Sequence, residues 1–442
     1  MPCRWGNRVL WRSLALIAFW GLCPTASARR VDAALYPYPY QDPYLASTTV
    51  AILKDRDQRY VWSEAQALEL ELIPGRNQVP LLEGKGKLHT RYLPQPGPAP
   101  LIVLLPGFGG SAYSGSARYV AQLFQDHGFQ VLSLPSPFHW NFALAASRSA
   151  LPGLTERDSA ELYRAIQAAL DQIRRRYHAE ITTIGLIGLS HGALVAGYLS
   201  KLDAEERRVG FGTTLLVNPP IDLLTTLRTI DRLADAERRF PAAARANLQA
   251  YAFGVGKAAL DRDIDDPSYF AHWNQRLRLS GEEIRYLIGW VLREPVGESL
   301  YVAELVRPLG ILRTPISWGY RSARLDEARS FGLMDYLRRV LIPKLNGGPA
   351  GGPDLEHWLQ RSSLKNLASF LREQRTVYLM HNADDFLVSR DDLAYAERVF
   401  GERAIIYPLG GHLGNLWYPQ NRRDMLEVMQ RPVTTAPARP RP

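Results

Sequence analysis

The feature that most constrains the fold is an apolar, β-branched run that leads directly into the pattern G-x-S-x-G. Residues 181–187 read I-T-T-I-G-L-I, and residues 188–192 read G-L-S-H-G. The first run is typical of a buried strand, and the small residues that follow at 193–197 are typical of a helix packed closely on a sheet. A serine between such elements needs neighbours without a Cβ, because the flanking chains would otherwise collide. The sequence therefore predicts a sharp strand-to-helix turn centred on Ser190.

Similar apolar runs predict further strands that are buried on both faces. They cover residues 100–105, 129–134, 213–217, 376–380 and 404–407. Helical patterns separate them, and the clearest, at about 157–175, carries its apolar residues on one stripe, with Thr155 and Asp158 as a predicted capping pair. Alternating strands and helices imply a mostly parallel sheet that is flanked by helices.

The alternation stops between about 221 and 372, where helical patterns follow one another. We therefore expect an α/β domain in two halves, residues 100–220 and 373–430, with a helical cap inserted at 221–372. A Gly/Pro stretch at 346–353 is predicted to be a flexible link inside the cap. Ahead of the domain, residues 29–99 are predicted to form an aromatic, proline-rich lead that wraps over the body, and two antiparallel edge strands at 67–73 and 87–93.

The two ends of the chain are predicted to lie outside the fold. Residues 1–28 combine three arginines, an apolar run at 14–23 and the small residues A-S-A, which is typical of a cleaved signal peptide and predicts a periplasmic or secreted protein. An uncleaved membrane anchor is the alternative, although about ten apolar residues fall short of the roughly 20 that span a bilayer. Cys23 also suggests a lipoprotein, but Leu22 stands where processing needs a small residue. The Pro/Arg tail at 431–442 is predicted to be disordered.

Composition excludes several kinds of site. Both cysteines, Cys3 and Cys23, fall in the predicted signal, so the exported chain would have neither a disulfide nor a zinc-thiolate site. The formal net charge of +9 comes partly from arginines at the two ends, and the remainder is too small to indicate nucleic acid as a partner. A G-x-G-x-x-A match at 107–112 lacks the acid that a dinucleotide ribose needs after the next strand. We expect no metal and no organic cofactor.

Two later strands lead into the residue types that activate a serine. A serine hydroxyl needs a base to remove its proton, and the base needs a third group to fix its tautomer. The run at 376–380 continues into H-N-A-D-D-F-L-V, and the run at 404–407 continues into P-L-G-G-H-L-G. Asp385 is the candidate acid and His412 the candidate base, with Asp384 as the alternative acid that the spacing to Val388 disfavours. His381, beside the acid, is expected to be a structural hydrogen-bonding residue.

A serine turn, then an acid in the context D-x-x-V, then a histidine in G-G-H-L-G, resembles the α/β-hydrolase family over about residues 101–427. Residues 218–223, N-P-P-I-D-L, are also similar to the esterase branch. The resemblance implies an oxyanion hole made by two main-chain N–H groups, one from the residue after the serine and one from a loop after an earlier strand. Those residues are His191 and Phe108, although Pro106-Gly107 stands where family members commonly carry His-Gly.

The resemblance implies a serine hydrolase that cleaves an acyl bond of a small molecule through a Ser190, His412 and Asp385 triad, and the predicted signal at 1–28 implies that it is exported. A carboxylic ester is the preferred substrate, as for a carboxylesterase or lipase, and peptides, amides and thioesters are alternatives. An inactive binding protein of the same fold is the alternative from another class. His139 and Trp140 are predicted either to line the pocket or to pack beside it. The aromatic lead suggests a peripheral membrane contact, and the sequence indicates no oligomeric state.

Overall fold

The computed structural model describes residues 27–49, 65–235, 239–261, 279–345 and 354–431. Three predictions fall wholly or almost wholly outside these residues: the signal at 1–28, the Gly/Pro link at 346–353 and the tail at 431–442. Both cysteines also lie outside them. Within the described residues, no helix is long and apolar enough to cross a membrane.

Within these described ranges, nine strands form one sheet in the order β1-β9-β8-β7-β6-β4-β5-β3-β2. Their bounds are β1 Arg29–Arg30, β2 Gln66–Leu70, β3 Leu88–Leu93, β4 Ala99–Leu105, β5 Gln130–Ser133, β6 Ile181–Leu189, β7 Phe211–Val217, β8 Val377–Asn382 and β9 Ala404–Tyr407. The pairs β2–β3 and β3–β5 are antiparallel, and all the others are parallel. The prediction of a mostly parallel sheet is confirmed, but β3 is not an edge strand because it lies between β2 and β5.

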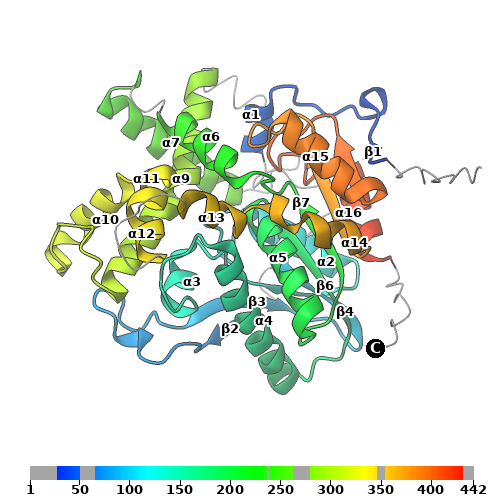
Figure 1. Cartoon of the computed structure of the whole chain (residues 1–442), viewed down its shortest axis with the longest axis horizontal. Coiled ribbons are helices and arrows are strands. Elements are labelled where there is room, and N and C mark those ends of the chain that lie inside the picture. The colour runs from blue at the N-terminus through cyan, green and yellow to red at the C-terminus, as the bar shows by residue number, and fades with distance from the viewer. Residues whose placement is uncertain (1–26, 50–64, 236–238, 262–278, 346–353, 432–442) are drawn as a thin grey trace, which may run out of the picture.

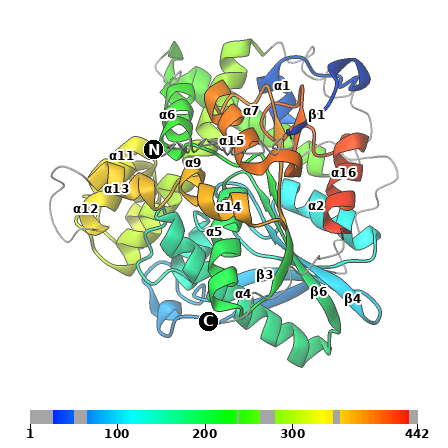
Figure 2. The same ribbon diagram turned by 45° about the vertical axis from the view of Figure 1, so that its right-hand side comes forward.

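Helices cover both faces of this sheet (Figures 1 and 2). On β4, Leu101 and Val103 pack into one core with α4 (Thr155–Tyr177) and α5 (His191–Glu206). Ile102, between them, packs into a second core with α2 (Gly115–Asp126) and α16 (Pro419–Met429). Successive side chains of a strand point to opposite faces, so an unbroken apolar run is what a strand with two covered faces requires.

The helix α4 begins at Thr155, but the predicted capping pair is wrong. Leu154 occupies the N-cap and makes no side-chain cap bond. The Thr155 hydroxyl donates instead to the carbonyl oxygen of Ser362 at 3.1 Å, and the Asp158 carboxylate accepts the N–H of Gly153 at 2.6 Å. Each side chain therefore bonds to a partner outside the expected pair, and the partner of Thr155 lies 207 positions away in the chain, beyond the reach of a local pattern.

The helices between β7 and β8 follow one another as the pattern predicted, and Figure 1 shows most of them gathered at the left and top. They are α6 Leu223–Ala234, α7 Ala242–Asp261, α9 Gly281–Val306, α10 Arg321–Arg329, α11 Leu333–Tyr336, a π-helical segment Leu337–Leu341, α12 Ile342–Leu345, α13 Asp354–Gln360 and α14 Ala368–Glu373. Helix α9 continues without interruption through Pro295. Its proline packs on Gly109, where an added Cβ would lie 2.1 Å from Pro295 Cγ.

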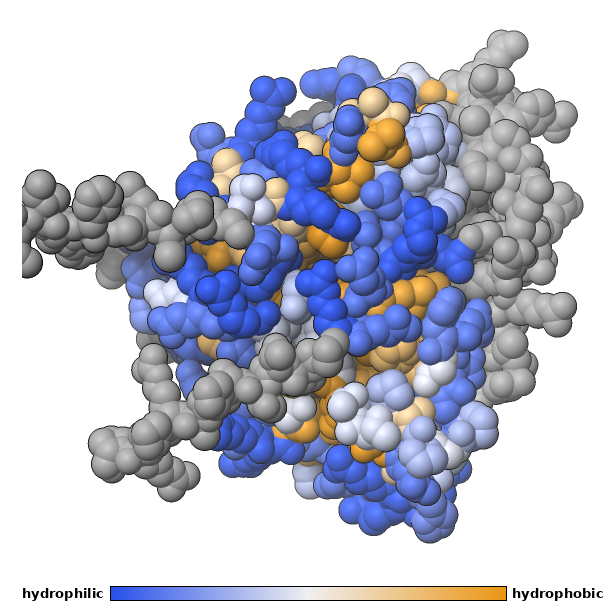
Figure 3. Space-filling model, turned by 90° about the vertical axis from the view of Figure 1, so that its right-hand side faces the viewer, coloured by the Kyte–Doolittle hydropathy of each residue, from blue (hydrophilic) through white to orange (hydrophobic). Residues whose placement is uncertain are grey.

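The N-terminal lead lies on the body of the protein, as predicted. The rings of Tyr36, Tyr38 and Tyr40 are buried, and the Tyr36 hydroxyl donates to Asn421 Oδ1 at 2.6 Å. These rings motivated the predicted membrane contact, and in this structure they face protein. The face seen in Figure 3 is mostly hydrophilic outside the grey segments, with apolar side chains in small separate groups.

Candidate active site

Ser190 lies on the predicted turn, between the last residue of β6 and the first residue of α5. Its backbone has φ 52° and ψ −121°, a conformation that is strained for a residue with a side chain. A Cβ on Gly188 would lie 2.2 Å from the carbonyl oxygen of Gly192, and a Cβ on Gly192 would lie 2.3 Å from that of Pro106. The glycines of the pattern therefore make this turn sterically possible.

The structure brings Ser190, His412 and Asp385 into one hydrogen-bonded chain. His412 Nε2 lies 2.7 Å from Ser190 Oγ, and His412 Nδ1 lies 2.9 Å from Asp385 Oδ2. All three residues are buried. They follow β6, β9 and β8, which are parallel strands, so they meet at the carboxyl edge of the sheet.

The carboxylate of Asp385 is held in its ionised form. Its Oδ2 also accepts the amide of Asn218 at 2.9 Å, and its Oδ1 accepts the N–H of Leu387 at 3.0 Å. Burial alone would raise the pKa of Asp385, but the attraction to His412 and the hydrogen bonds from His412 and Asn218 outweigh it, and the pKa is lowered. Asn218 was in a run singled out by the sequence, but its contact with the acid was not predicted.

Asp384 occupies a different place from the acid beside it. Its carboxylate accepts the N–H groups of Gly410 at 3.1 Å and Gly411 at 2.9 Å, in the loop that carries His412. Burial raises the pKa of Asp384 to about 6. Of the two candidate acids, Asp385 is therefore the one that contacts the imidazole, and Asp384 holds the histidine loop.

Phe108 and His191, the predicted oxyanion-hole residues, both lie beside Ser190. His191 is the first residue of α5, so its N–H has no acceptor within the helix. A Cβ on Gly107 would lie 3.4 Å from Ser190 Cβ, which places the loop that carries Phe108 against the serine. The position of both residues agrees with the prediction, and their role in catalysis stays a prediction.

The His191 side chain is enclosed by aromatic rings. The rings of Phe108 and Phe138 meet it edge to face, at centroid distances of 5.5 and 5.4 Å. Burial lowers the pKa of His191 to about 4, so the ring is neutral at pH 7. Its Nδ1 is buried and makes no hydrogen bond with the described residues.

The other two histidines that the sequence singled out have structural contacts. His381 lies within hydrogen-bonding distance of the carbonyl oxygens of Asn382, at 3.1 Å, and Pro219, at 3.2 Å, which agrees with the prediction. His139 caps α3 (Trp140–Ala145) by accepting the N–H of Asn141, and burial lowers its pKa to about 4. Neither His139 nor Trp140 lines the pocket beside Ser190.

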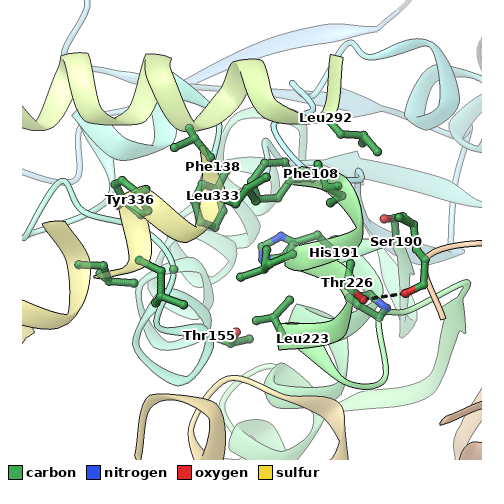
Figure 4. Close-up of a pocket in the computed structure, with 18 of the residues that line it drawn as sticks. Phe108, Phe138, Thr155, Ser190, His191, Leu223, Thr226, Leu292, Leu333 and Tyr336 are labelled. Atoms are coloured by element: carbon green, nitrogen blue, oxygen red, sulfur yellow. Dashed lines mark hydrogen bonds between the residues drawn. The ribbon is translucent and has the colours of Figure 1, made fainter. Parts of the chain in front are cut away.

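An apolar pocket opens beside Ser190 and runs beneath the inserted helices (Figure 4). The space between its walls is about 650 Å³ when the open solvent at its mouth is included. Its walls comprise Phe108, Phe138, Gly153, Thr155, His191, Pro220, Leu223, Thr226, Leu227, Ile230, Leu292, Val296, Leu333, Tyr336, Leu337, Leu341, Trp358 and Leu387. The inserted helices α6, α9, α11 and α13 and the π-helical segment supply more than half of them.

The hydroxyl and indole donors in the pocket wall, apart from Ser190, are already engaged with main-chain carbonyl oxygens, and the His191 ring is the remaining polar side chain of the wall. Thr226 donates to Leu387 at 3.0 Å, and the Tyr336 hydroxyl donates to Pro152 at 2.7 Å. Trp358 Nε1 likewise donates to Gly153 at 2.7 Å. A ligand in this pocket therefore meets an apolar surface. Within the described residues, no group of three or more His, Cys, Asp or Glu side chains could hold a metal ion.

A strained serine between a strand and a helix, with an acid and then a histidine after later strands of the same sheet, is the arrangement of α/β-hydrolases. The chain has the α/β-hydrolase fold. This assignment rests on the sheet order and on the chain order Ser190, Asp385, His412.

Comparisons with known proteins give distant similarities, and no family model matches the chain. Mouse (Mus musculus) mitochondrial acyl-coenzyme A thioesterase 2 is 29% identical over 152 residues, which are 34% of this chain and 30% of that protein. The chain thus spans less than a third of the length of that relative.

Three solved structures illustrate the structural similarity. An acylaminoacyl peptidase in complex with Z-Gly-Gly-Phe-chloromethyl ketone gives a TM-score of 0.42 at 12% identity, over 84% of this chain and 42% of the peptidase. The Pyrococcus furiosus esterase Pf2001 gives a TM-score of 0.41 at 12% identity, over 83% of this chain and 92% of the esterase. A thioesterase domain from the curacin biosynthetic pathway gives a TM-score of 0.37 at 12% identity, over 83% of this chain and 99% of that domain. Their names span ester, thioester and peptide hydrolysis, so they do not select a substrate.

Proposed function

We propose that this α/β-hydrolase is a serine hydrolase that cleaves a carboxylic ester through an acyl-enzyme. The observation that carries the proposal is the 2.7 Å contact between His412 Nε2 and Ser190 Oγ, with Asp385 bonded to the other ring nitrogen and an apolar pocket beside the serine. In this mechanism Ser190 attacks the acyl carbonyl while His412 takes its proton and then gives it to the leaving group.

Asp385 keeps the imidazole in the tautomer that can accept from Ser190, because its Oδ2 accepts the Nδ1 proton. The main-chain N–H groups of Phe108 and His191 stabilise the oxyanion that develops in the transition state. Water then attacks the acyl-enzyme with His412 again as base, so no metal or organic cofactor takes part in the proposed reaction.

The apolar pocket favours an acyl group without charge. A charged group would lose its hydration in a wall of aliphatic and aromatic side chains whose hydroxyl and indole donors are already engaged and whose one histidine, His191, is neutral. A carboxylic ester with an apolar acyl chain therefore fits this site better than a charged peptide. A chromogenic series of p-nitrophenyl esters from acetate to decanoate would rank the chain length by kcat/KM.

A thioester is the second candidate, because the partial similarity to mouse acyl-coenzyme A thioesterase 2 favours it. A matched pair of substrates with the same acyl group, one an oxygen ester and one a thioester, separates the two proposals. We expect the oxygen ester to react with the higher kcat/KM.

The hydrolase proposal is tested by covalent labelling. We expect a fluorophosphonate probe to label the purified chain and not its Ser190→Ala variant, since the reagent needs an activated serine. An unlabelled wild-type chain would favour the alternative, an inactive binding protein of this fold.

Export is part of the proposal and rests on residues 1–28 alone. Expression with the full leader in a Gram-negative host should yield a periplasmic product whose first residue is Arg29. A product that keeps residues 1–28 in the membrane fraction would support the membrane-anchored alternative.

A further inference from the structure

Helix α1 (Pro43–Thr48) packs directly on the loop that carries His412. The hydroxyl of Ser47 accepts the main-chain N–H of His412 at 2.7 Å and donates to the carbonyl oxygen of Pro43 at 2.6 Å. A Cβ on Gly411 would lie 2.1 Å from that same carbonyl oxygen. The helix and the loop are therefore in backbone contact, with no room for a side chain between them.

More of the N-terminal lead holds the far end of this loop. The carbonyl oxygen of Gly414 accepts the hydroxyl of Tyr38 at 2.9 Å and that of Thr49 at 3.0 Å. The near end is held by the Asp384 carboxylate described above. Hydrogen bonds from side chains to the main chain thus fix the loop that carries His412 on both sides of this residue, and the N-terminal lead makes three of them.

Helix α1 also contacts the acid loop and the inserted helices. The ring of Tyr44 stacks on Phe386 at a centroid distance of 4.5 Å and an interplanar angle of 19°. On α9, the guanidinium carbon of Arg285 lies 4.7 Å from the centroid of the Tyr44 ring. Because Phe386 follows Asp385 directly, one short helix contacts the base loop, the acid loop and α9.

We propose that α1 is a positioning element of the active site, in which Ser47 sets the backbone of His412 and Tyr44 ties the acid loop to α9. This inference rests on the proposed function, because it assigns a consequence for the reaction. A displacement of about 1 Å in a reacting group can lower a rate by about 100-fold. Loss of the Ser47 hydroxyl should therefore lower kcat and leave KM, which the apolar pocket determines, nearly unchanged.

The test compares Ser47→Ala with Thr48→Ala, a matched control on the same helix whose hydroxyl donates to the carbonyl oxygen of Leu45. We expect Ser47→Ala to lower kcat for p-nitrophenyl butyrate by about 10-fold or more, with KM within about twofold of the wild type. Thr48→Ala should retain the wild-type kcat. Equal kcat values for the two variants would overturn the proposal.

A second readout does not depend on turnover. The proton between His412 Nδ1 and Asp385 should give a downfield proton NMR signal in the wild type and in Thr48→Ala, and a broadened or absent signal in Ser47→Ala. An unchanged signal in Ser47→Ala would also overturn the proposal. A wild type that shows this signal but neither turns over esters nor reacts with the fluorophosphonate would contradict the proposed function instead.

The Tyr44 contact is tested in the same way if Ser47→Ala does not fold. Tyr44→Ser should lower kcat, whereas Tyr44→Phe, which keeps the ring, should retain the wild-type kcat. An activity loss that is equal in the two Tyr44 variants would show that the ring stack is not what positions the acid loop.

Discussion

Replacement of Asp385 by asparagine should stop the reaction while it preserves the shape of the site. In the structure Asp385 Oδ2 accepts from His412 and Asn218, and Oδ1 accepts from Leu387. An amide has only one oxygen, so its NH₂ group must face at least one of these donors. If the NH₂ takes the place of Oδ1, it opposes the N–H of Leu387, so the acid loop must shift. If the NH₂ faces His412, Nδ1 must become the acceptor and the ring proton moves to Nε2. That nitrogen would then donate to Ser190 and could no longer take its proton.

The size of this effect follows from the tautomer. The same substitution in the Ser-His-Asp triad of a serine protease lowers kcat by about 10⁴, which is equivalent to about 5 kcal/mol of transition-state stabilisation. We expect a loss of that order for Asp385→Asn, measured as kcat on p-nitrophenyl butyrate. The melting temperature should stay within a few degrees of the wild type.

Asp384→Asn is the matched control, because Asp384 contacts the histidine loop and not the imidazole. We expect its kcat to fall by no more than about 100-fold, since the histidine loop loses one acceptor but no tautomer changes. A kcat for Asp385→Asn within about 10-fold of the wild type, or a larger loss for Asp384→Asn, would refute the assignment of the acid.

Three further predictions concern the pocket and the stability of the fold. Leu227→Trp should fill the pocket beside Ser190, so kcat/KM should fall by more than about 10-fold for octanoate esters and change little for acetate esters. Equal losses of kcat/KM for the two esters would contradict the pocket assignment. Burial raises the pKa of Asp158 to about 7, so ionisation opposes folding and stability is lost as pH rises from about 4 to 7. Asp158→Asn should remove much of this decrease in the free energy of unfolding, which is on the order of 2 kcal/mol between about pH 5 and 8 when measured by urea unfolding. A variant whose free energy of unfolding depends on pH as the wild type's does would contradict the prediction. Glu304→Ala should lower the free energy of unfolding by about 3 kcal/mol, because it removes the buried carboxylate that pairs with Arg324 at 3.1 Å and accepts three main-chain N–H groups. A loss below about 1 kcal/mol would contradict the reasoning.

The sheet and the three central residues of the site could be predicted because their signals are local. A strand segment that is covered on both faces must be apolar, and β4 and the carboxyl-terminal halves of β6 and β7 all read that way. Parallel strands end at one edge of a sheet, so residues that follow β6, β8 and β9 are brought together by topology alone. The choice of Asp385 over Asp384 depended on the spacing to Val388, and the contact with His412 agrees with it.

The residues that support this site could not be predicted, because their partners are distant in the chain. Ser47 lies 365 positions from the histidine whose N–H it accepts, and it stands in a segment that carried no catalytic pattern. The passage of α9 through Pro295 depends on a glycine in another loop, Gly109, whose missing Cβ leaves room for the ring. The hydroxyl of Thr155 was assigned to a local cap, but a segment brought close by folding supplied its acceptor.

The most direct test of the central claim is an intact-mass measurement after a rapid acid quench of the protein with a p-nitrophenyl ester. The account predicts an increase by the mass of one acyl group, located by peptide mapping on Ser190, and no increase in Ser190→Ala or His412→Ala. Turnover of the ester by the wild type and by Ser190→Ala at the same rate, with no acyl adduct in either, would contradict it.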